Sequence, residues 1–224
     1  MPITVWLSFL ALALLLVFPL LFGELMLAGL GKLHVSSEGA ALLMVSIILG
    51  GFINIPIRRY VRHEEVIMHP LAVFGLSGYW PQLRRVRRET IIAVNVGGCL
   101  IPTALALYEL VHLAESAWPI LAVTALACTL NAFVCYLVAR PVPGIGIVMP
   151  GFVSPIVAAG LAVLLAPDQA APVAYVAGVA GPLIGADLLH LGDIRKTAVG
   201  LASIGGAGTF DGIVLSGIVA AYLA

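Results

Sequence analysis

The chain has 224 residues, of which 62% are hydrophobic and only 10% are charged, whereas a soluble domain is typically about 45–50% apolar and about 25% charged. This composition excludes a soluble domain and a disordered chain, and a formal net charge of zero excludes a protein that recruits nucleic acid by its overall field. The cysteines lie in apolar runs and indicate neither a disulfide framework nor a metal site. We therefore predict an integral membrane protein.

Long apolar segments follow one another along the chain. A spanning helix needs about 20 mostly apolar residues, and the segments that qualify cover residues 3–30, 40–57, 90–113, 117–139, 151–166, 171–191 and 197–224. The predicted fold is all-α: one transmembrane domain over residues 1–224, with about seven spans. The last segment is rich in glycine, so we expect an interrupted helix there.

The basic residues predict the orientation of these spans. All but one follow spans two, four or six, and they are Arg58, Arg59, Arg62, Arg84, Arg85, Arg87, Arg88, Arg140, Arg195 and Lys196. Because cytoplasmic loops carry an excess of Lys and Arg, we expect a cytoplasmic N-terminus in a prokaryotic inner membrane, with Lys32 outside. The polar connection at 58–89 is predicted to be cytoplasmic and to form a short hairpin or an interfacial element. Its arginines either fix the topology or bind anionic lipid.

Carboxylates within spans are costly and need a reason. Glu24 and Glu109 fall near the outer ends of their spans, where their side chains can reach water. Asp187 and Asp211 are shorter, and both are flanked by glycines that let another backbone approach closely. Two aspartates on consecutive antiparallel spans can face each other across a helix pair.

The two aspartates reach the same depth only if the last span is broken. Three glycines lie within residues 205–208, which favours an unwound segment. The closing helix would then begin near Thr209, which could cap it, with Asp211 in its first turn near the positive end of the helix dipole.

A second irregular segment lies at residues 140–151, where three prolines and three glycines forbid a continuous helix. It either exposes backbone groups that pair with an extended peptide or forms a tight re-entrant turn. The amides Asn54, Asn95 and Asn131 either hold helices together or contact a substrate.

Several strings resemble a family of bacterial and archaeal membrane proteins described only as a domain of unknown function (DUF1614): Phe-Ile-Asn-Ile-Pro at 52–56, Gly-Ala-Asp-Leu-Leu at 185–189 and Gly-Gly-Ala-Gly-Thr-Phe-Asp-Gly-Ile at 205–213. More distantly, the last two spans resemble the GxGD intramembrane aspartyl proteases, such as presenilin, signal peptide peptidase and prepilin peptidases. That resemblance implies two catalytic aspartates, Asp187 and Asp211. Here Thr209 and Phe210 separate the second glycine from the aspartate, unlike in that family.

The resulting hypothesis is an intramembrane aspartyl-type peptidase that uses no metal and no cofactor, with its site near the cytoplasmic side. Membrane lipids and a transmembrane peptide substrate are the expected partners. The residues expected to bind the substrate are Gly144, Gly146, Pro150, Gly206, Gly208, Asn54 and Asn95. The alternatives are an ion- or proton-coupled secondary transporter, in which Asp211 at a helix break binds the coupling ion, and a non-catalytic scaffold.

Overall fold

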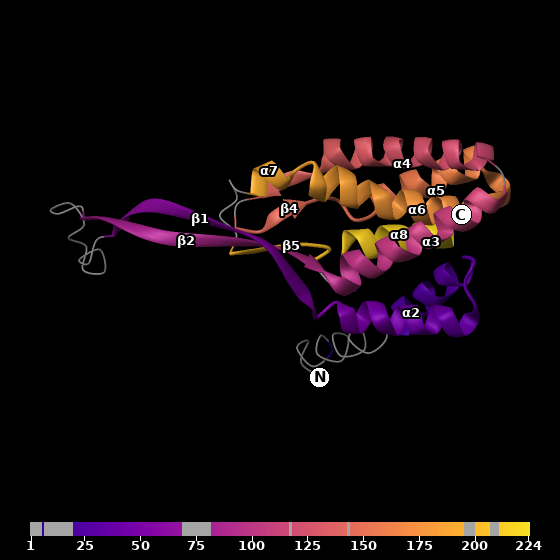
Figure 1. Cartoon of the computed structure of the whole chain (residues 1–224), viewed down its shortest axis with the longest axis horizontal. Helices are drawn as coiled ribbons and strands as arrows, with labels where there is room; N and C mark the ends of the chain where they lie inside the picture. Colours follow the sequence, from indigo (N-terminus) through magenta and orange to yellow (C-terminus); the bar gives the residue numbers. More distant parts are fainter. Residues whose placement is uncertain are drawn as a thin grey trace.

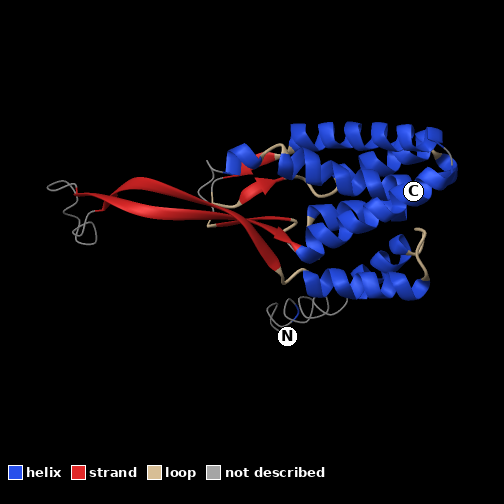
Figure 2. Ribbon diagram, in the orientation of Figure 1, coloured by secondary structure: helices blue, strands red, loops and turns tan. Residues whose placement is uncertain are grey.

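The computed structural model describes residues 6, 20–68, 82–116, 118–142, 144–194, 200–206 and 211–224. These residues form a body of helices lying side by side and a long β-hairpin that projects from one end of it (Figure 1). Figure 2 shows that the strands gather at this hairpin end, while the rest of the body is helical. The C-terminus lies toward the opposite end of the body (Figure 1).

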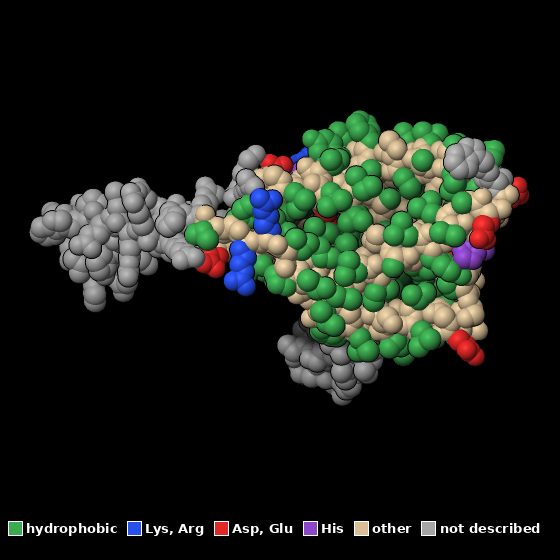
Figure 3. Space-filling model, viewed as in Figure 1, with side chains coloured by type: hydrophobic (Ala, Val, Ile, Leu, Met, Phe, Trp, Pro, Cys, Tyr) green, Lys and Arg blue, Asp and Glu red, His purple; other side chains and the backbone are tan. Residues whose placement is uncertain are grey.

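Among the described residues, three helical segments are long and apolar enough to cross a membrane. The first joins η2 (Val96–Leu100) to α3 (Ile101–Ser116), the second lies within α4 (Trp118–Val138), and the third joins η3 (Pro167–Gln169), α6 (Ala170–Ala180) and η4 (Gly181–Leu188). Shorter apolar helices accompany them at Leu20–Leu30, α2 (Ser37–Gly50), α5 (Val153–Leu165) and α8 (Gly212–Leu223). Their apolar side chains cover the face of the body seen in Figure 3.

The all-α prediction is confirmed in part: the described residues are mostly helical, but strands occupy parts of the predicted spans. β1 (Asn54–Met68) takes the end of the segment predicted at 40–57, and β2 (Gln82–Asn95) takes the start of the one predicted at 90–113. Residues 54–57 and 90–95 are rich in β-branched side chains, which favour strands over helices. Hydrophobicity alone does not distinguish the two.

The hairpin predicted at 58–89 is present and is much longer than expected. β1 and β2 are antiparallel, with Asn54 opposite Asn95 at the base and Met68 opposite Gln82 at the far end. At about 3.3 Å per residue, the paired strands reach about 45 Å from the body. A short strand, β5 (Leu201–Ile204), pairs in parallel with β2 near the base, so that it lies at the edge of the sheet β1-β2-β5.

α6 is the central helix of the body, since it contacts α3, α4, α5 and α8. Nearly all of its residues are buried, and they are mostly small. A Cβ added at Gly178 would lie 2.7 Å from the backbone oxygen of Ser216, so α6 and α8 touch backbone to backbone. Such close packing of small residues is how helices associate where the hydrophobic effect is weak.

The amide of Asn131 holds helices of the body together, which is one of the two roles that the sequence left open for it. Its Nδ2 donates to the Ser154 hydroxyl and to the Ala177 carbonyl oxygen, both at 2.9 Å. Ser154 is in turn hydrogen-bonded to Ser216. This buried network links α4, α5, α6 and α8.

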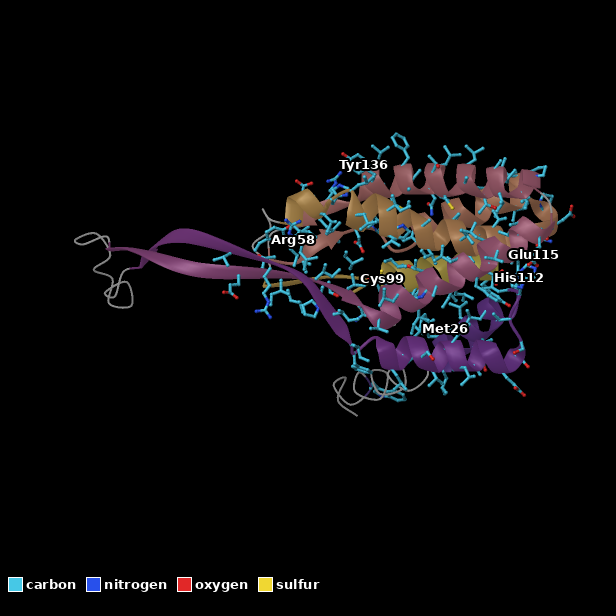
Figure 4. All side chains as sticks on the ribbon, viewed as in Figure 1. Met26, Arg58, Cys99, His112, Glu115 and Tyr136 are labelled. Carbon is cyan, nitrogen blue, oxygen red and sulfur yellow. The ribbon has the colours of Figure 1, made fainter. Side chains whose placement is uncertain are left out.

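Glu109 does not reach water at the outer end of its span, contrary to the prediction. Its side chain is fully buried, and it accepts hydrogen bonds from the backbone N–H of His34 at 3.1 Å and from His34 Nδ1 at 2.8 Å. The His34 ring stacks on His112, with ring centroids 5.1 Å apart. His112 and Glu115 mark this end of the body, opposite the hairpin (Figure 4). The loop before α2 thus supplies the partner that a buried carboxylate requires.

We expect His34→Ala to destabilise the protein by about 1–3 kcal/mol, because it leaves a buried carboxylate without its side-chain donor. Thermal unfolding in detergent micelles measures the effect. His112→Ala, which removes a ring hydrogen-bonded to the Tyr108 carbonyl oxygen and not to Glu109, should lower Tm less. An equal loss in the two variants would contradict this account.

We expect Gly98→Ala in η2 to lower Tm strongly, by an overpacking cost of about 1–3 kcal/mol. A Cβ at this position would lie 2.0 Å from the backbone oxygen of Gly205. Gly160→Ala in α5 is the matched control, because a Cβ there meets nothing within 4 Å. That control should leave Tm unchanged or raise it slightly, since alanine favours the helix.

Candidate functional site

Asp187 lies at the hairpin end of the third long helix. It is the penultimate residue of η4 (Gly181–Leu188), the π-helix that ends this long helix. π-Helical turns within α-helices are frequent at functional sites. Gly185 in this segment packs directly on α4, because a Cβ there would lie 2.1 Å from the Ala132 carbonyl oxygen. That contact fixes the end of the helix that carries Asp187.

Asp211 lies at the start of α8, just after a break in the chain's last apolar segment. β5 ends at Ile204 and α8 begins at Gly212, as the glycines of this segment predicted. Asp211 is the N-cap residue, and its side chain accepts a hydrogen bond from the backbone N–H of Ile213 at 2.9 Å. The sequence predicted that Thr209 caps this helix and that Asp211 lies in its first turn. Asp211 is the cap instead, and Thr209 lies outside the described residues.

The two aspartates line the same cavity, which has a volume of about 370 Å³. The Asp187 carboxyl interacts electrostatically with that of Asp211, and the backbone of Gly205 lies beside it. The cavity lies at the hairpin end of the body, and its walls are β5, the segment 145–147 and Ile194 of α7 (Leu191–Ile194). Asn54 and Gly206 complete the polar part of the lining.

A small hairpin separates this cavity from a second one. β3 (Arg140–Val142) and β4 (Gly146–Val148) are antiparallel, and Ile147 of β4 lines both the first cavity and another of about 230 Å³. Asp187 and Asp211 also line both cavities. The carboxyls are therefore approached from either side of β4.

An amide network supports the wall behind the aspartates. Asn95 is fully buried; its Oδ1 accepts from the Gly98 N–H at 2.7 Å, and its Nδ2 donates to the Gly51 carbonyl oxygen at 2.8 Å and to Asn54 Oδ1 at 3.1 Å. Ser203 of β5 donates to the same Asn54 oxygen at 2.5 Å. Because Asn54 Oδ1 accepts two hydrogen bonds, its NH₂ is the group that can serve a ligand in the cavity.

The residues predicted to bind a substrate fall into three groups. Asn54, Gly146 and Gly206 line the first cavity with the aspartates. Asn95 lies behind the wall, and Gly144 and Pro150 are outside the lining. Gly208 lies outside the described residues.

Gly144 and Gly146 are set apart by their backbone conformation. Their φ angles are +79° and +119°, a region that side chains disfavour, and a Cβ at either would meet nothing within 4 Å. Conformation rather than crowding therefore explains glycine at both ends of the turn between β3 and β4.

A metal centre built from Asp187, Asp211 and His190 has no support in the described part of the chain, where no group of at least three His, Cys, Asp or Glu side chains could hold an ion. His190 Nδ1 instead lies 3.1 Å from the carbonyl oxygens of Gly185 and Ala186, and its ring packs on Tyr136. It caps the helix that carries Asp187.

Sequence reasoning missed Ser203, Ile147 and Cys99. Ser203 and Ile147 come from short strands that carry no motif. Cys99 is buried in η2 and interacts electrostatically with both aspartates, at the end of the body where the hairpin joins it (Figure 4). Cys99 could have been found from the sequence by its place just after Gly97 and Gly98, because two adjacent glycines allow another backbone to pack closely against them.

The apolar helices, with an acidic pair at the ends of two of them, are typical of a helical membrane protein. More particularly, the chain belongs to the family described as "Protein of unknown function (DUF1614)", whose model matches residues 48–223. No curated protein and no solved structure matches the chain. The family description carries no activity, so any function must be argued from the site.

We expect the first cavity to contain water. In a variant without the native cysteines, Ala202→Cys should react rapidly with a water-soluble maleimide, because Ala202 lines the cavity. Ala174→Cys, which is fully buried in α6, should react at least about tenfold more slowly, since only the exposed thiolate reacts. Equal rates, measured by mass shift, would contradict an open cavity.

Proposed function

We propose that the protein is an intramembrane aspartyl-type peptidase whose catalytic pair is Asp187 and Asp211. The observation that carries this proposal is that the two carboxyls, from the ends of two different helices, line one cavity at the hairpin end of the helical body. Two neighbouring carboxyls share a proton, because they cannot both ionise cheaply. Such a pair holds a general base and a general acid at once.

The chemistry follows from that shared proton. The ionised carboxyl removes a proton from a water molecule, whose oxygen attacks the carbonyl carbon of the peptide bond. The protonated carboxyl gives its proton to the carbonyl oxygen, which produces a tetrahedral diol. Return of a proton to the amide nitrogen breaks the C–N bond and releases an amine and a carboxylic acid.

The strand edges beside the aspartates suit an extended peptide. All four residues of β5 line the first cavity, as do Gly146 and Ile147 of β4. β5 is an edge strand of its sheet, and β4 pairs only with β3 among the described strands. A peptide that enters between them can add a strand to an edge, so the segment at 140–151 fits the strand-addition alternative better than a plain re-entrant turn.

The apolar lining favours a membrane-derived substrate. Ile145, Ile194, Leu201 and Ile204 surround the polar groups of the cavity, so the peptide bond meets two carboxyls while its flanking side chains meet aliphatic ones. A transmembrane segment that is unwound near its end has apolar side chains on both sides of an exposed peptide bond, which matches this lining.

We also propose the finer topology. Seven segments cross a prokaryotic inner membrane, the shorter helices tilting or ending in the polar wall of the site, and the N-terminus and the β1–β2 hairpin are cytoplasmic. The distribution of charge supports this orientation: Arg58, Arg59 and Arg140 lie at the hairpin end, whereas Lys32 binds the Tyr222 carbonyl oxygen near the C-terminus. Basic residues mark the cytoplasmic side.

A secondary transporter has less support. Carriers place their carboxylates in broken helices near the bilayer midplane. Asp187 and Asp211 instead lie at the ends of their helices, beside strand edges that a small ion does not need.

We expect Asp187→Asn and Asp211→Asn each to reduce cleavage of a membrane-embedded model peptide by about a hundredfold or more, the usual contribution of a general acid or base. The assay uses the purified chain in liposomes with a single-span reporter peptide and detects fragments by mass spectrometry. Asp168→Asn is the matched control, because Asp168 is an exposed residue of η3 away from both cavities. Unchanged cleavage in both site variants would refute the proposal, and proton-coupled uptake lost in Asp211→Asn would favour the transporter.

A further inference from the structure

We propose that the two carboxyls have fixed and unequal roles: Asp211 is the ionised member that takes the proton from water, and Asp187 is the protonated member that donates to the carbonyl oxygen. This inference rests on the proposed function for its catalytic meaning. The assignment of the proton itself rests only on where the two side chains lie.

The helix ends around the site have opposite polarity. Asp211 is the N-cap of α8, a helix of 12 residues, and the N-terminus of a helix stabilises a negative charge. Asp187 is the penultimate residue of η4, at the C-terminal end of a continuous helical segment that begins at Pro167. The partial negative charge at that end opposes ionisation of the carboxyl.

Backbone groups lie beside both carboxyls. Asp211 accepts a hydrogen bond from the N–H of Ile213, and the backbone of Gly205 favours the Asp187 anion, so a backbone group supports each anion. His190 binds the carbonyl oxygens of Gly185 and Ala186, the two residues just before Asp187. That contact weakens the negative end of η4 but supplies no positive helix end like the one at Asp211.

The positions also suit the two roles. The cap geometry holds the Asp211 carboxylate against a backbone N–H, where it keeps its charge before and between reactions. Asn54 lines the same cavity, and its NH₂ is a second donor that can help Asp187 polarise the carbonyl oxygen as negative charge develops there. As the C–N bond breaks, the proton taken by Asp211 passes to the leaving nitrogen, and Asp187 regains its proton from the diol.

A lipid-soluble carbodiimide tests the assignment without any substrate. The O–H of a protonated carboxyl adds across a C=N bond of dicyclohexylcarbodiimide, and the adduct rearranges to a stable N-acylurea with no atom lost. An ionised carboxylate does not start this addition. The full chain in liposomes is treated at neutral pH, and the modified residue is located by mass spectrometry of its peptides.

We expect Asp187 to be labelled about tenfold more than Asp211, the preference that two opposed helix ends produce together. At acidic pH both should be labelled, which shows that the reagent reaches Asp211 through the cavities that the two residues share. Labelling of Asp211 in preference, of both equally, or of neither at neutral pH overturns the assignment. Labelling of Asp187 in a chain that cleaves no peptide refutes the peptidase and leaves the assignment standing.

A matched pair of proline variants tests the cause. Ile213→Pro removes the N–H that binds Asp211 and should raise the labelling of Asp211 several-fold at neutral pH. Gly212→Pro introduces the same ring but keeps that N–H, and a Cβ at Gly212 meets nothing within 4 Å, so it should leave the ratio unchanged. Proline is tolerated in the first turn of a helix. Where Ile213→Pro does not fold, the ratio in the unaltered chain decides the question.

Discussion

A backbone contact between two glycine segments determines where the acidic pair lies. η2 presents Gly98 to Gly205 so closely that a Cβ on either would overlap the other's main chain, and Gly205 has a φ of +68° that suits glycine. The backbone of Gly205 then lies beside Asp187. On the far side of η2, Gly97 is equally tight against the end of α2. No side chain therefore lies between η2 and Gly205, and main-chain contact sets the position of this part of the wall, with the Asn95 side chain hydrogen-bonded to Gly51 and Gly98 beside it.

The helical part of the fold was readable from the sequence wherever hydrophobicity and length agree. The segments predicted at 117–139 and 171–191 correspond to α4 and to the helix ending at Leu188. Hydrophobicity failed where a strand and a span share the same residue types. Ile91, Ile92 and Val94 are apolar in either state, and only pairing with β1 and β5 makes them a strand. That pairing involves residues distant in the sequence, so no local pattern reports it.

The two aspartates of the candidate site could be predicted from the sequence, whereas most residues that line the cavity around them could not. Asp187 and Asp211 stood out because carboxylates are rare and costly in apolar segments, and the glycines at 205–208 predicted the break that brings them together. Ser203 and Ile147 belong to short strands whose place depends on the tertiary fold. Glu109 was misread for a related reason: its partner, His34, lies in a loop that no spacing rule connects to α3. Amides were ambiguous by nature, and the structure separates Asn131, which joins helices, from Asn54, which faces the cavity.

The parallel pairing of β5 with β2 has a consequence for biosynthesis. Ile91 and Leu201 are partners, yet the second is translated long after the first has left the ribosome, and α8 follows later still. Until those closing residues reach the translocon, the groove beside the hairpin lacks both its edge strand and Asp211. A nascent chain therefore carries only half of the acidic pair until α8 has followed.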